Sequence, residues 1–304
     1  MIQFHRYELK SATPLNSLGA RRTFPGALIL VNGGIGCIHP WPELGDGTLE
    51  DHLNALRQGE STPLVRRALH CCEIDGEARR AGRSLFANET IPQSHATLNH
   101  IPSIEECDAL GLARFSAVKI KVNGHDSGVV HQLEPLTAAD LSLRLDFNLS
   151  LTKDRFIALV QTMSDDLRAA IDFVEDPFIY HRQGWREAHA ATKLHLALDQ
   201  VILLADPQSY DVMVWKPAKT DGPPCAARLI VTSYMDHAVG QMFAAYEAAR
   251  SGTRELCGLL THPLFERDPF FECIQSDGPS LNAPSGTGLG FDDLIAKLPW
   301  KPLI

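Results

Sequence analysis

The chain has 304 residues, of which 44% are hydrophobic and 21% are charged, and 28 basic residues stand against 37 acidic ones for a net charge of −9. This length accommodates a β/α barrel of about 250 residues together with a small second domain. The acidic balance argues against a general binder of nucleic acid phosphates. No apolar run reaches the roughly 20 residues that a membrane span requires, so we expect neither nucleic acid nor membrane as a partner.

Three further features of the sequence bear on its location and on metal binding. Residues 1–10 alternate as a strand does and lack the basic-then-apolar layout of a signal peptide, which predicts a cytoplasmic location. The seven cysteines are scattered apart from the adjacent Cys71 and Cys72, so we expect reduced, buried thiols. The 13 histidines show no zinc-ligand spacing, so zinc is not expected.

An α+β domain is predicted over residues 1–95. Its predicted elements are strands at 3–9 and 27–32, a loop containing Gly, Pro and Arg at 11–25, and helices at 48–57 and 63–82. The loop between the two strands predicts a hairpin-like opening to the chain.

A β/α barrel is predicted over residues 96–275, because short apolar runs alternate there with helical patterns. The predicted strands are 97–101, 117–122, 142–147, 171–175, 195–198, 212–216, 228–232 and 255–259. The helices between them are predicted at 103–110, 152–168, 181–191 and 237–251. Eight strands is the number in a TIM barrel, which we expect instead of an open doubly wound sheet. Residues 276–304 are predicted to be a C-terminal segment that returns toward the first domain.

Charged side chains recur where the predicted barrel strands end. They are Lys119, Lys121, Asp146, Glu175, Asp199 and Lys216. The steps from Lys121 through the three acids are 24 to 29 residues, close to one βα unit of about 30 residues, and the C-terminal ends of barrel strands converge on one mouth. Three converging carboxylates repel one another unless a cation lies between them. Oxygen-only ligation favours Mg²⁺, with Mn²⁺ as the alternative.

A purely structural explanation stays open for each of these residues alone. An Asp after a strand often caps a helix, and a Lys at a strand end is often solvated. Asp140 and Asp154 flank Asp146, but neither ends an apolar run, so Asp146 is the preferred ligand. Lys219 competes with Lys216 but falls in the following loop, which predicts a surface group. The joint order and period of the charges favour a site.

The strings around these charges resemble successive signatures of the enolase superfamily. They are Lys119-Ile120-Lys121, Leu143-Arg144-Leu145-Asp146-Phe147-Asn148, Phe173-Val174-Glu175-Asp176-Pro177, Leu196-Ala197-Leu198-Asp199 and Val214-Trp215-Lys216-Pro217. Within the superfamily, the short chain and the Arg-x-Asp-x-Asn and Lys-Pro strings most resemble the o-succinylbenzoate synthase family of menaquinone biosynthesis. Residues 36–43 are similar to the Gly-x-x-x-Pro-x-Pro turn of that family's capping domain. The resemblance implies an enolase-type modified TIM barrel with an N-terminal α+β capping domain.

The resemblance also implies a reaction. A metal-dependent carbon–oxygen lyase would dehydrate a small-molecule carboxylate, 2-succinyl-6-hydroxy-2,4-cyclohexadiene-1-carboxylate, through an enediolate. Asp146, Glu175 and Asp199 would ligate the metal. Lys121 would act as base and then as acid on the same face, and Lys216 would stabilise the enediolate from the other face of the ring.

Further positions are carried over as supporting or substrate-binding residues, namely Lys119, Arg144, Asn148, Ser233 and Gly258. Lys119 lies on the same strand face as Lys121, so we expect each lysine to lower the pKa of the other. Arg144 and Asn148 are expected to support the metal site. Ser233 matches a position that binds the succinyl carboxylate, and Gly258 matches the glycine of the eighth strand.

Two departures from the family pattern concern the substrate pocket. Gln200 stands where the family usually has an acidic residue, and residues 233–237 replace a serine-rich string. The exact substrate is therefore left open, and an N-acylamino-acid racemase or dipeptide epimerase of the same superfamily is the alternative. A second, more remote alternative is a barrel that binds a metabolite without catalysing a reaction. In the family the 11–25 loop, which carries Arg21 and Arg22 here, folds over the barrel mouth; the sequence predicts neither its closure nor the oligomeric state.

Overall fold

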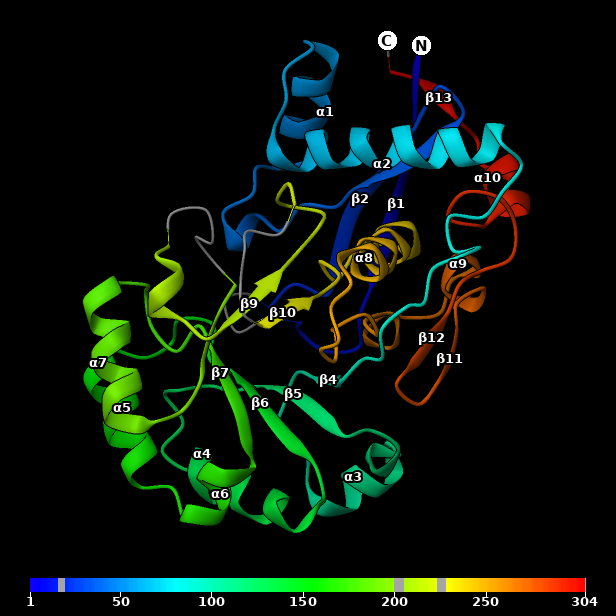
Figure 1. Cartoon of the computed structure of the whole chain (residues 1–304). Coiled ribbons are helices and arrows are strands. Elements are labelled where there is room, and N and C mark those ends of the chain that lie inside the picture. The colour runs from blue at the N-terminus through cyan, green and yellow to red at the C-terminus, as the bar shows by residue number, and fades with distance from the viewer. Residues whose placement is uncertain (16–19, 200–204, 223–227, 304) are drawn as a thin grey trace. The chain divides into compact units, whose positions relative to one another are not determined.

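A computed structural model describes residues 1–15, 20–199, 205–222 and 228–303 of the chain (Figure 1). It divides into two compact units. The first unit consists of Met1–Gln93, Lys216–Gly222 and Val231–Ile304, and the second of Ser94–Trp215 and Pro223–Ile230. Residues 231–275 thus cluster with the N-terminal residues. The domain division predicted above, at 95 and 275, follows the chain instead of spatial clustering and stays a prediction.

The first unit contains an antiparallel sheet in the order β13-β1-β2-β3. Strands β1 (Ile2–Lys10) and β2 (Thr23–Val31) pair along their whole length. Strand β13 (Lys301–Pro302) pairs with β1 through Gln3 and Phe4, which brings the two ends of the chain side by side (Figure 1). The long pairing of β1 with β2 confirms the two predicted strands, although β2 begins within the predicted loop.

The sequence reasoning missed a third strand, β3 (Gly34–Ile38), which pairs antiparallel with β2. Glycine is usually unfavourable inside a strand, so this segment reads as a turn. The structure gives the reason for the glycines. A Cβ added at Gly34 would lie 1.9 Å from the Cys72 carbonyl oxygen, and one at Gly36 would lie 2.2 Å from the Ala68 carbonyl oxygen. The strand needs both glycines because helix α2 (Pro63–Arg80) packs directly on its backbone.

Replacing Gly34 with alanine should therefore destabilise the protein by about 2 to 4 kcal/mol, because backbone must move to admit the methyl group. Chemical denaturation measures this change. Gly184, in helix α7 (Arg182–Thr192), is the matched control, since a Cβ there meets only ordinary contacts at 3.7 Å. Alanine at 184 should be neutral or stabilise by up to about 1 kcal/mol. Equal stability of the two variants would contradict the packing argument.

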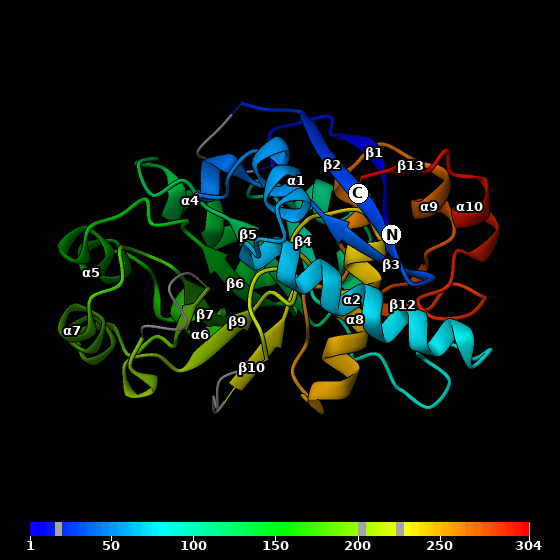
Figure 2. The same ribbon diagram turned by 90° about the horizontal axis from the view of Figure 1, so that it is seen from above.

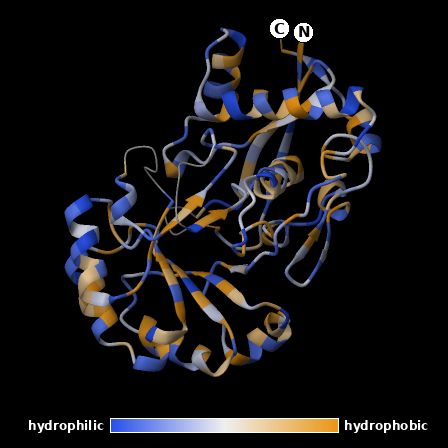
Figure 3. Ribbon diagram, in the orientation of Figure 1, coloured by the Kyte–Doolittle hydropathy of each residue, from blue (hydrophilic) through white to orange (hydrophobic). Residues whose placement is uncertain are grey.

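Two helices cover the sheet of the first unit. Helix α1 (Leu49–Arg57) begins at a capping box formed by Thr48 and Asp51, and α2 begins after Thr62, whose side chain accepts from the Val65 amide. Apolar residues of both helices and of β2 and β3 form one buried cluster. Figure 3 shows the corresponding mixture of apolar and polar residues along α2. Both predicted helices are confirmed.

The second unit is built on a sheet in the order β10-β9-β8-β7-β6-β5-β4. Its strands are β4 (Ala96–Leu98), β5 (Ala117–Lys121), β6 (Ser142–Asp146), β7 (Ile171–Glu175), β8 (Leu196–Leu198), β9 (Val212–Trp215) and β10 (Arg228–Val231). The pairings from β4 to β9 are parallel. The eighth predicted strand, 255–259, is reduced to an isolated parallel bridge between Thr232 and Gly258, which belongs to the first unit.

Helices and strands of the second unit share one buried apolar cluster. A second cluster, Phe173, Ala197, Val212, Val214 and Ile230, contains alternate residues of the strands. The predicted helix at 152–168 is two helices, α5 (Lys153–Gln161) and α6 (Asp165–Ala170), because Ser164 caps a new helix through the Leu167 amide. Helices α5 and α7 lie side by side (Figure 2).

The remaining elements are short apart from one helix. They are α3 (Ile104–Ala109), α4 (Val129–Leu133), α8 (Ala238–Ser251), α9 (Pro269–Glu272), α10 (Asp292–Lys297), β11 (Gln275–Asp277) and β12 (Ser280–Asn282).

Within the part of the chain that the structure describes, none of the helices combines the length and apolar character needed to cross a membrane. Of the cysteines, Cys37 is half-buried and Cys273 is exposed, contrary to the expectation of buried thiols, and Cys225 lies outside the described residues.

Candidate active site

The strand register of the second unit aligns three of the predicted site residues in one rank. Lys121 pairs with Asp146 across β5 and β6, and Asp146 pairs with Glu175 across β6 and β7. Glu175 pairs with Ala197 on β8, so Asp199 lies two residues further on the same face. Each of these strands ends at or next to its charged residue. The parallel register therefore brings the C-terminal ends of four neighbouring strands, and their charges, together.

Lys119 lies between two of these carboxylates. Its Nζ donates to Glu175 Oε1 at 2.5 Å and lies 3.1 Å from Asp146 Oδ2. Burial acts to lower the pKa of Lys119, but the charges of Asp146, Glu175 and Asp199 outweigh it and the pKa is raised. The direction is opposite to the lowered pKa that was expected, because the charges of three carboxylates outweigh the burial of the ammonium.

Asp176 is a member of this cluster that the sequence reasoning left out. Its carboxylate is buried and accepts from the Asp199 amide at 3.3 Å. Its φ of +40° is rare for a residue other than glycine. Burial, followed by the charges of Asp199, Glu175 and Asp146, raises the pKa of Asp176 well above its ordinary value. The adjacent acids Glu175-Asp176 before Pro177 were the available signal.

The turn after β6 orients Asp146. The backbone amide of Asn148 donates to Asp146 Oδ1 at 3.1 Å, and Asn148 itself has φ +45°. The Leu149 amide donates to the carbonyl oxygen of Asp176 at 2.7 Å, which ties this turn to the end of β7. The backbone of Asn148 thus supports the Asp146 carboxylate, while a role for its side chain stays a prediction.

The chemistry of this cluster fits a hard divalent cation. Asp146, Glu175 and Asp199 offer only carboxylate oxygens, the donors that Mg²⁺ and Mn²⁺ prefer. Burial and then the negative charge of Asp199, Glu175 and Asp146 raise the pKa of Asp176 beside these carboxylates. In the described residues no three Asp, Glu, His or Cys side chains present their donor atoms together as a formed metal site. The Lys119 ammonium lies between Asp146 and Glu175.

Arg144 lies two residues before Asp146 and is buried. Its Nε donates to Asp172 Oδ2 at 2.9 Å, its Nη1 donates to His95 Nδ1 at 2.8 Å, and its guanidinium lies over the Phe173 ring. Asp172 also pairs with Arg228 at 2.9 Å. These contacts hold Arg144 within the sheet of the second unit, and support of the metal site through it stays a prediction.

Removing the shared carboxylate should destabilise the second unit. Asp172→Asn leaves Arg144, whose side chain is 2% exposed, with an uncompensated charge, and we expect a loss of about 2 to 4 kcal/mol in urea denaturation. Asp165 pairs with Arg168 but is 93% exposed, so Asp165→Asn should change stability by less than about 0.5 kcal/mol. A neutral Asp172→Asn would show that the two arginines do not depend on this carboxylate.

Lys216 and the competing Lys219 belong to the first unit, where both contact the ring of Tyr234. Their Nζ atoms lie 5.7 Å and 5.4 Å from its centroid. Lys219 also lies 3.4 Å from Asp46 Oδ1, and its side chain is 35% exposed. The Lys219 side chain thus keeps partial exposure, in line with a surface group, while its ammonium pairs with a carboxylate that is 7% exposed.

Ser233 and Gly258 lie next to each other in the first unit. The Ser233 amide donates to the Gly258 carbonyl at 3.1 Å, and the Ser233 hydroxyl lies 2.5 Å from that of Thr261. Arg21, from the 11–25 loop, pairs with Glu43 at 3.0 Å and lies over the rings of Phe24 and Trp41. Substrate contacts of Ser233 and Gly258 stay predictions. Residue 200, where the family pattern departs, lies outside the described residues, as do residues 16–19 of the loop.

Comparison with known proteins shows the family to which the chain belongs. Residues 2–78 match the family model described as O-succinylbenzoate synthase, N-terminal domain. An o-succinylbenzoate synthase from Bdellovibrio bacteriovorus is 32% identical to the chain, over 99% of this chain and 98% of that relative. The chain belongs to the o-succinylbenzoate synthase family. It is therefore a member of a family of enzymes.

Solved structures place this o-succinylbenzoate synthase family member in the enolase fold. A mandelate racemase/muconate lactonizing protein from Herpetosiphon aurantiacus superposes with a TM-score of 0.77 at 15% identity, covering 95% of this chain and 97% of that one. Muconate lactonizing enzyme from Pseudomonas fluorescens gives 0.76 at 16% identity, with 95% of each chain covered. The predicted fold class, an enolase-type β/α barrel with an N-terminal α+β domain, is confirmed.

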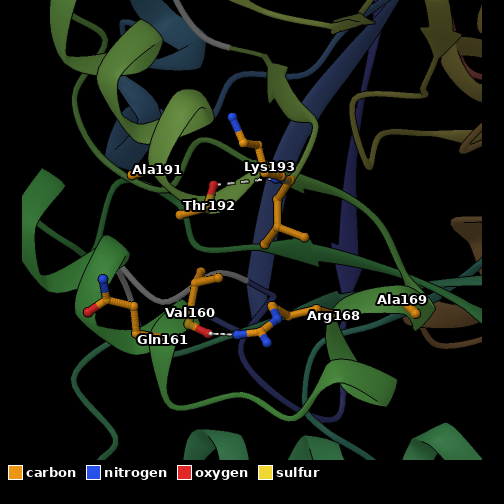
Figure 4. A pocket seen from close by; sticks show the side chains of 8 residues that line it. Val160, Gln161, Arg168, Ala169, Ala191, Thr192 and Lys193 are labelled. Carbon is orange, nitrogen blue, oxygen red and sulfur yellow. Dashed lines mark hydrogen bonds between the residues drawn. The ribbon is translucent and has the colours of Figure 1, made fainter.

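A surface pocket of about 430 Å³ lies in the second unit of this family member (Figure 4). Its lining residues are Val160, Gln161, Arg168, Ala169, Ala191, Thr192, Lys193 and Leu194. Ala169 and Leu194 come just before β7 and β8, so the pocket lies at the N-terminal ends of these strands. In TIM barrels that end contributes to stability while chemistry occurs at the other. This pocket is not the candidate active site.

Proposed function

We propose that this chain is an o-succinylbenzoate synthase, a carbon–oxygen lyase that dehydrates 2-succinyl-6-hydroxy-2,4-cyclohexadiene-1-carboxylate in menaquinone biosynthesis in the cytoplasm. The observation that carries the proposal is the rank of Lys121, Asp146 and Glu175 on neighbouring parallel strands. The 32% identity to the Bdellovibrio bacteriovorus o-succinylbenzoate synthase over nearly the whole chain supports the choice of substrate.

Lys121 would perform both proton transfers. Its neutral amine takes the proton α to the substrate carboxylate, and the ammonium so formed returns that proton to the departing hydroxide on the same face. Water leaves and the ring becomes aromatic. Lys121 suits this task because it ends β5 in a half-buried position beside the carboxylate rank. A positioned side chain of this kind contributes about 10²- to 10⁴-fold to a proton transfer.

Asp146, Glu175 and Asp199 would hold Mg²⁺, with Mn²⁺ as the alternative. When bound, the metal would supply Lewis-acid stabilisation of the negative charge that develops on the substrate carboxylate. Lys216 would contribute a second positive charge near the π-system of the substrate ring. The ammonium of Lys216 already takes part in such a contact with the Tyr234 ring, which supports this role.

The test of the proposed substrate compares reactions in parallel. The purified chain is given Mg²⁺ with the cyclohexadiene precursor, with an N-acylamino acid, and with a dipeptide. We expect aromatic product from the first with a kcat/KM far above that of proton exchange at the α-carbon of the other two. Racemisation or epimerisation without aromatic product would replace the proposal by an isomerase of the same superfamily.

A further inference from the structure

The carboxylate of Asp46 joins three segments of the first unit that are distant in sequence. Oδ2 accepts from the Trp41 amide at 2.9 Å and from the Tyr234 hydroxyl at 2.8 Å. Oδ1 lies 3.4 Å from the Lys219 ammonium. The Asp46 side chain is 7% exposed, and a carboxylate that has lost most of its hydration depends on such partners. The contacts link the turn of residues 41–46 to the segment after β9 and to the segment after β10.

Tyr234 connects Asp46 to Lys216. Its side chain is buried, its hydroxyl donates to Asp46, and its carbonyl oxygen accepts from Trp41 Nε1 at 2.8 Å. Its ring has the ammonium groups of both Lys216 and Lys219 within 6 Å, at 5.7 and 5.4 Å. A ring held at its hydroxyl and at its backbone keeps its position, and cation–π attraction to the ring restricts where the lysine ammonium groups lie.

The backbone that carries Lys216 is held on the same side. The amides of Lys219 and Thr220 donate to the Lys216 carbonyl oxygen at 2.9 and 3.2 Å, which makes one compact turn. Because Lys219 is in that turn, its pairing with Asp46 restrains the turn as well as a side chain. Arg67, which is buried, donates to the Pro217 carbonyl at 2.7 Å and restrains the turn from another direction.

From this geometry we infer that Asp46 is a positioning residue for Lys216, acting through Tyr234 and Lys219. The inference rests on the proposed function, since it takes Lys216 as the catalytic lysine. Asp46 lies 170 positions before Lys216 in the chain, and the contacts above reach the lysine only through the two intermediaries. Displacing a reacting group by about 1 Å costs up to about 100-fold in rate, so the restraint has a kinetic consequence.

The kinetic test compares Asp46→Asn, Tyr234→Phe and the double variant in the o-succinylbenzoate assay. The phenyl ring keeps the contact with both lysines but loses the hydroxyl bond to Asp46. We expect each single variant to lower kcat by about 10- to 100-fold with KM changed by less than about threefold. The double variant should be no worse than Asp46→Asn alone, because Tyr234→Phe removes only one of the contacts that Asp46→Asn already disturbs. Glu50→Gln is the control, since Glu50 pairs with Arg6 on the surface of the same unit.

Unchanged kcat in Asp46→Asn, or multiplied losses in the double variant, would overturn the inference. A readout independent of turnover is hydrogen exchange at the Lys219 and Thr220 amides. In Asp46→Asn these amides should exchange at least about tenfold faster, while amides of β1 and β2 stay unchanged. If the unaltered protein makes no o-succinylbenzoate, the proposed function fails, and the exchange rates still decide whether Asp46 restrains the Lys216 turn. Unchanged exchange would reject the restraint itself.

Discussion

Replacing Lys121 with alanine should lower kcat by about 10⁴-fold or more while leaving the fold and the magnesium affinity near normal. The loss is large because one amine serves as base and then as acid, and each proton transfer by a positioned side chain is worth about 10²- to 10⁴-fold. The fold should survive because Lys121 ends β5 and is only half-buried. The value of kcat comes from stopped-flow or steady-state kinetics. Circular dichroism checks the fold, and calorimetric titration with Mg²⁺ measures the metal affinity.

The control for this variant is Lys153→Ala. Lys153 is also a lysine of the second unit, but its side chain is 37% exposed and pairs with Glu187 on α7. Its removal should leave kcat and stability nearly unchanged, because exposed ion pairs contribute little. Retained turnover in Lys121→Ala would remove Lys121 from its assigned role. A loss of kcat accompanied by an equal loss of folded protein would show a structural contribution instead.

Glu175→Gln should weaken magnesium binding by at least about 100-fold, since even residues that only orient metal ligands cost about 10- to 100-fold when lost. Glu175 is the middle acid of the rank and is 2% exposed. The amide keeps the shape of the side chain but loses the charge, so the partner of Lys119 at 2.5 Å becomes a neutral acceptor. Titration with Mg²⁺, or with Mn²⁺ followed by electron paramagnetic resonance, measures the affinity.

Glu187→Gln is the matched control, because Glu187 is 44% exposed and pairs with Lys153 on the outside of the same unit. It should bind the metal as the unaltered protein does. Magnesium dependence that is the same in Glu175→Gln as in the unaltered protein would exclude Glu175 from the metal ligands. The proposal would then have to rely on Asp146, Asp199 and the neighbouring Asp176.

Much of the fold could be predicted because its periodic segments are long or strongly apolar. The predicted strands that became β5 through β9 lie within one or two residues of the observed bounds, since each is a buried apolar run ending in a charge. Strand β3 escaped because its glycines, required by the backbone of α2 at 1.9 and 2.2 Å, are typical of turns. That requirement comes from a contact with residues more than 30 positions away, which no local pattern contains.

The part of the candidate site that consists of charged residues at strand ends could be predicted from the sequence. Spacing and order single out Asp146 and Glu175, and the parallel register then aligns them. The position of Lys119 between two carboxylates depends on side-chain geometry and reverses the expected direction of its pKa. The bond from Tyr234 to Asp46 joins residues 188 positions apart. Nothing in the sequence around either residue indicates such a contact.

The most direct test of the proposed function is o-succinylbenzoate formation from the cyclohexadiene precursor, followed by ultraviolet absorbance with Mg²⁺ and then with excess chelator. We predict rapid formation of the aromatic product with Mg²⁺, its loss on chelation, and its return when Mg²⁺ or Mn²⁺ is restored. A folded protein that binds Mg²⁺ but forms no o-succinylbenzoate, or forms it equally well in excess chelator, would contradict the proposal.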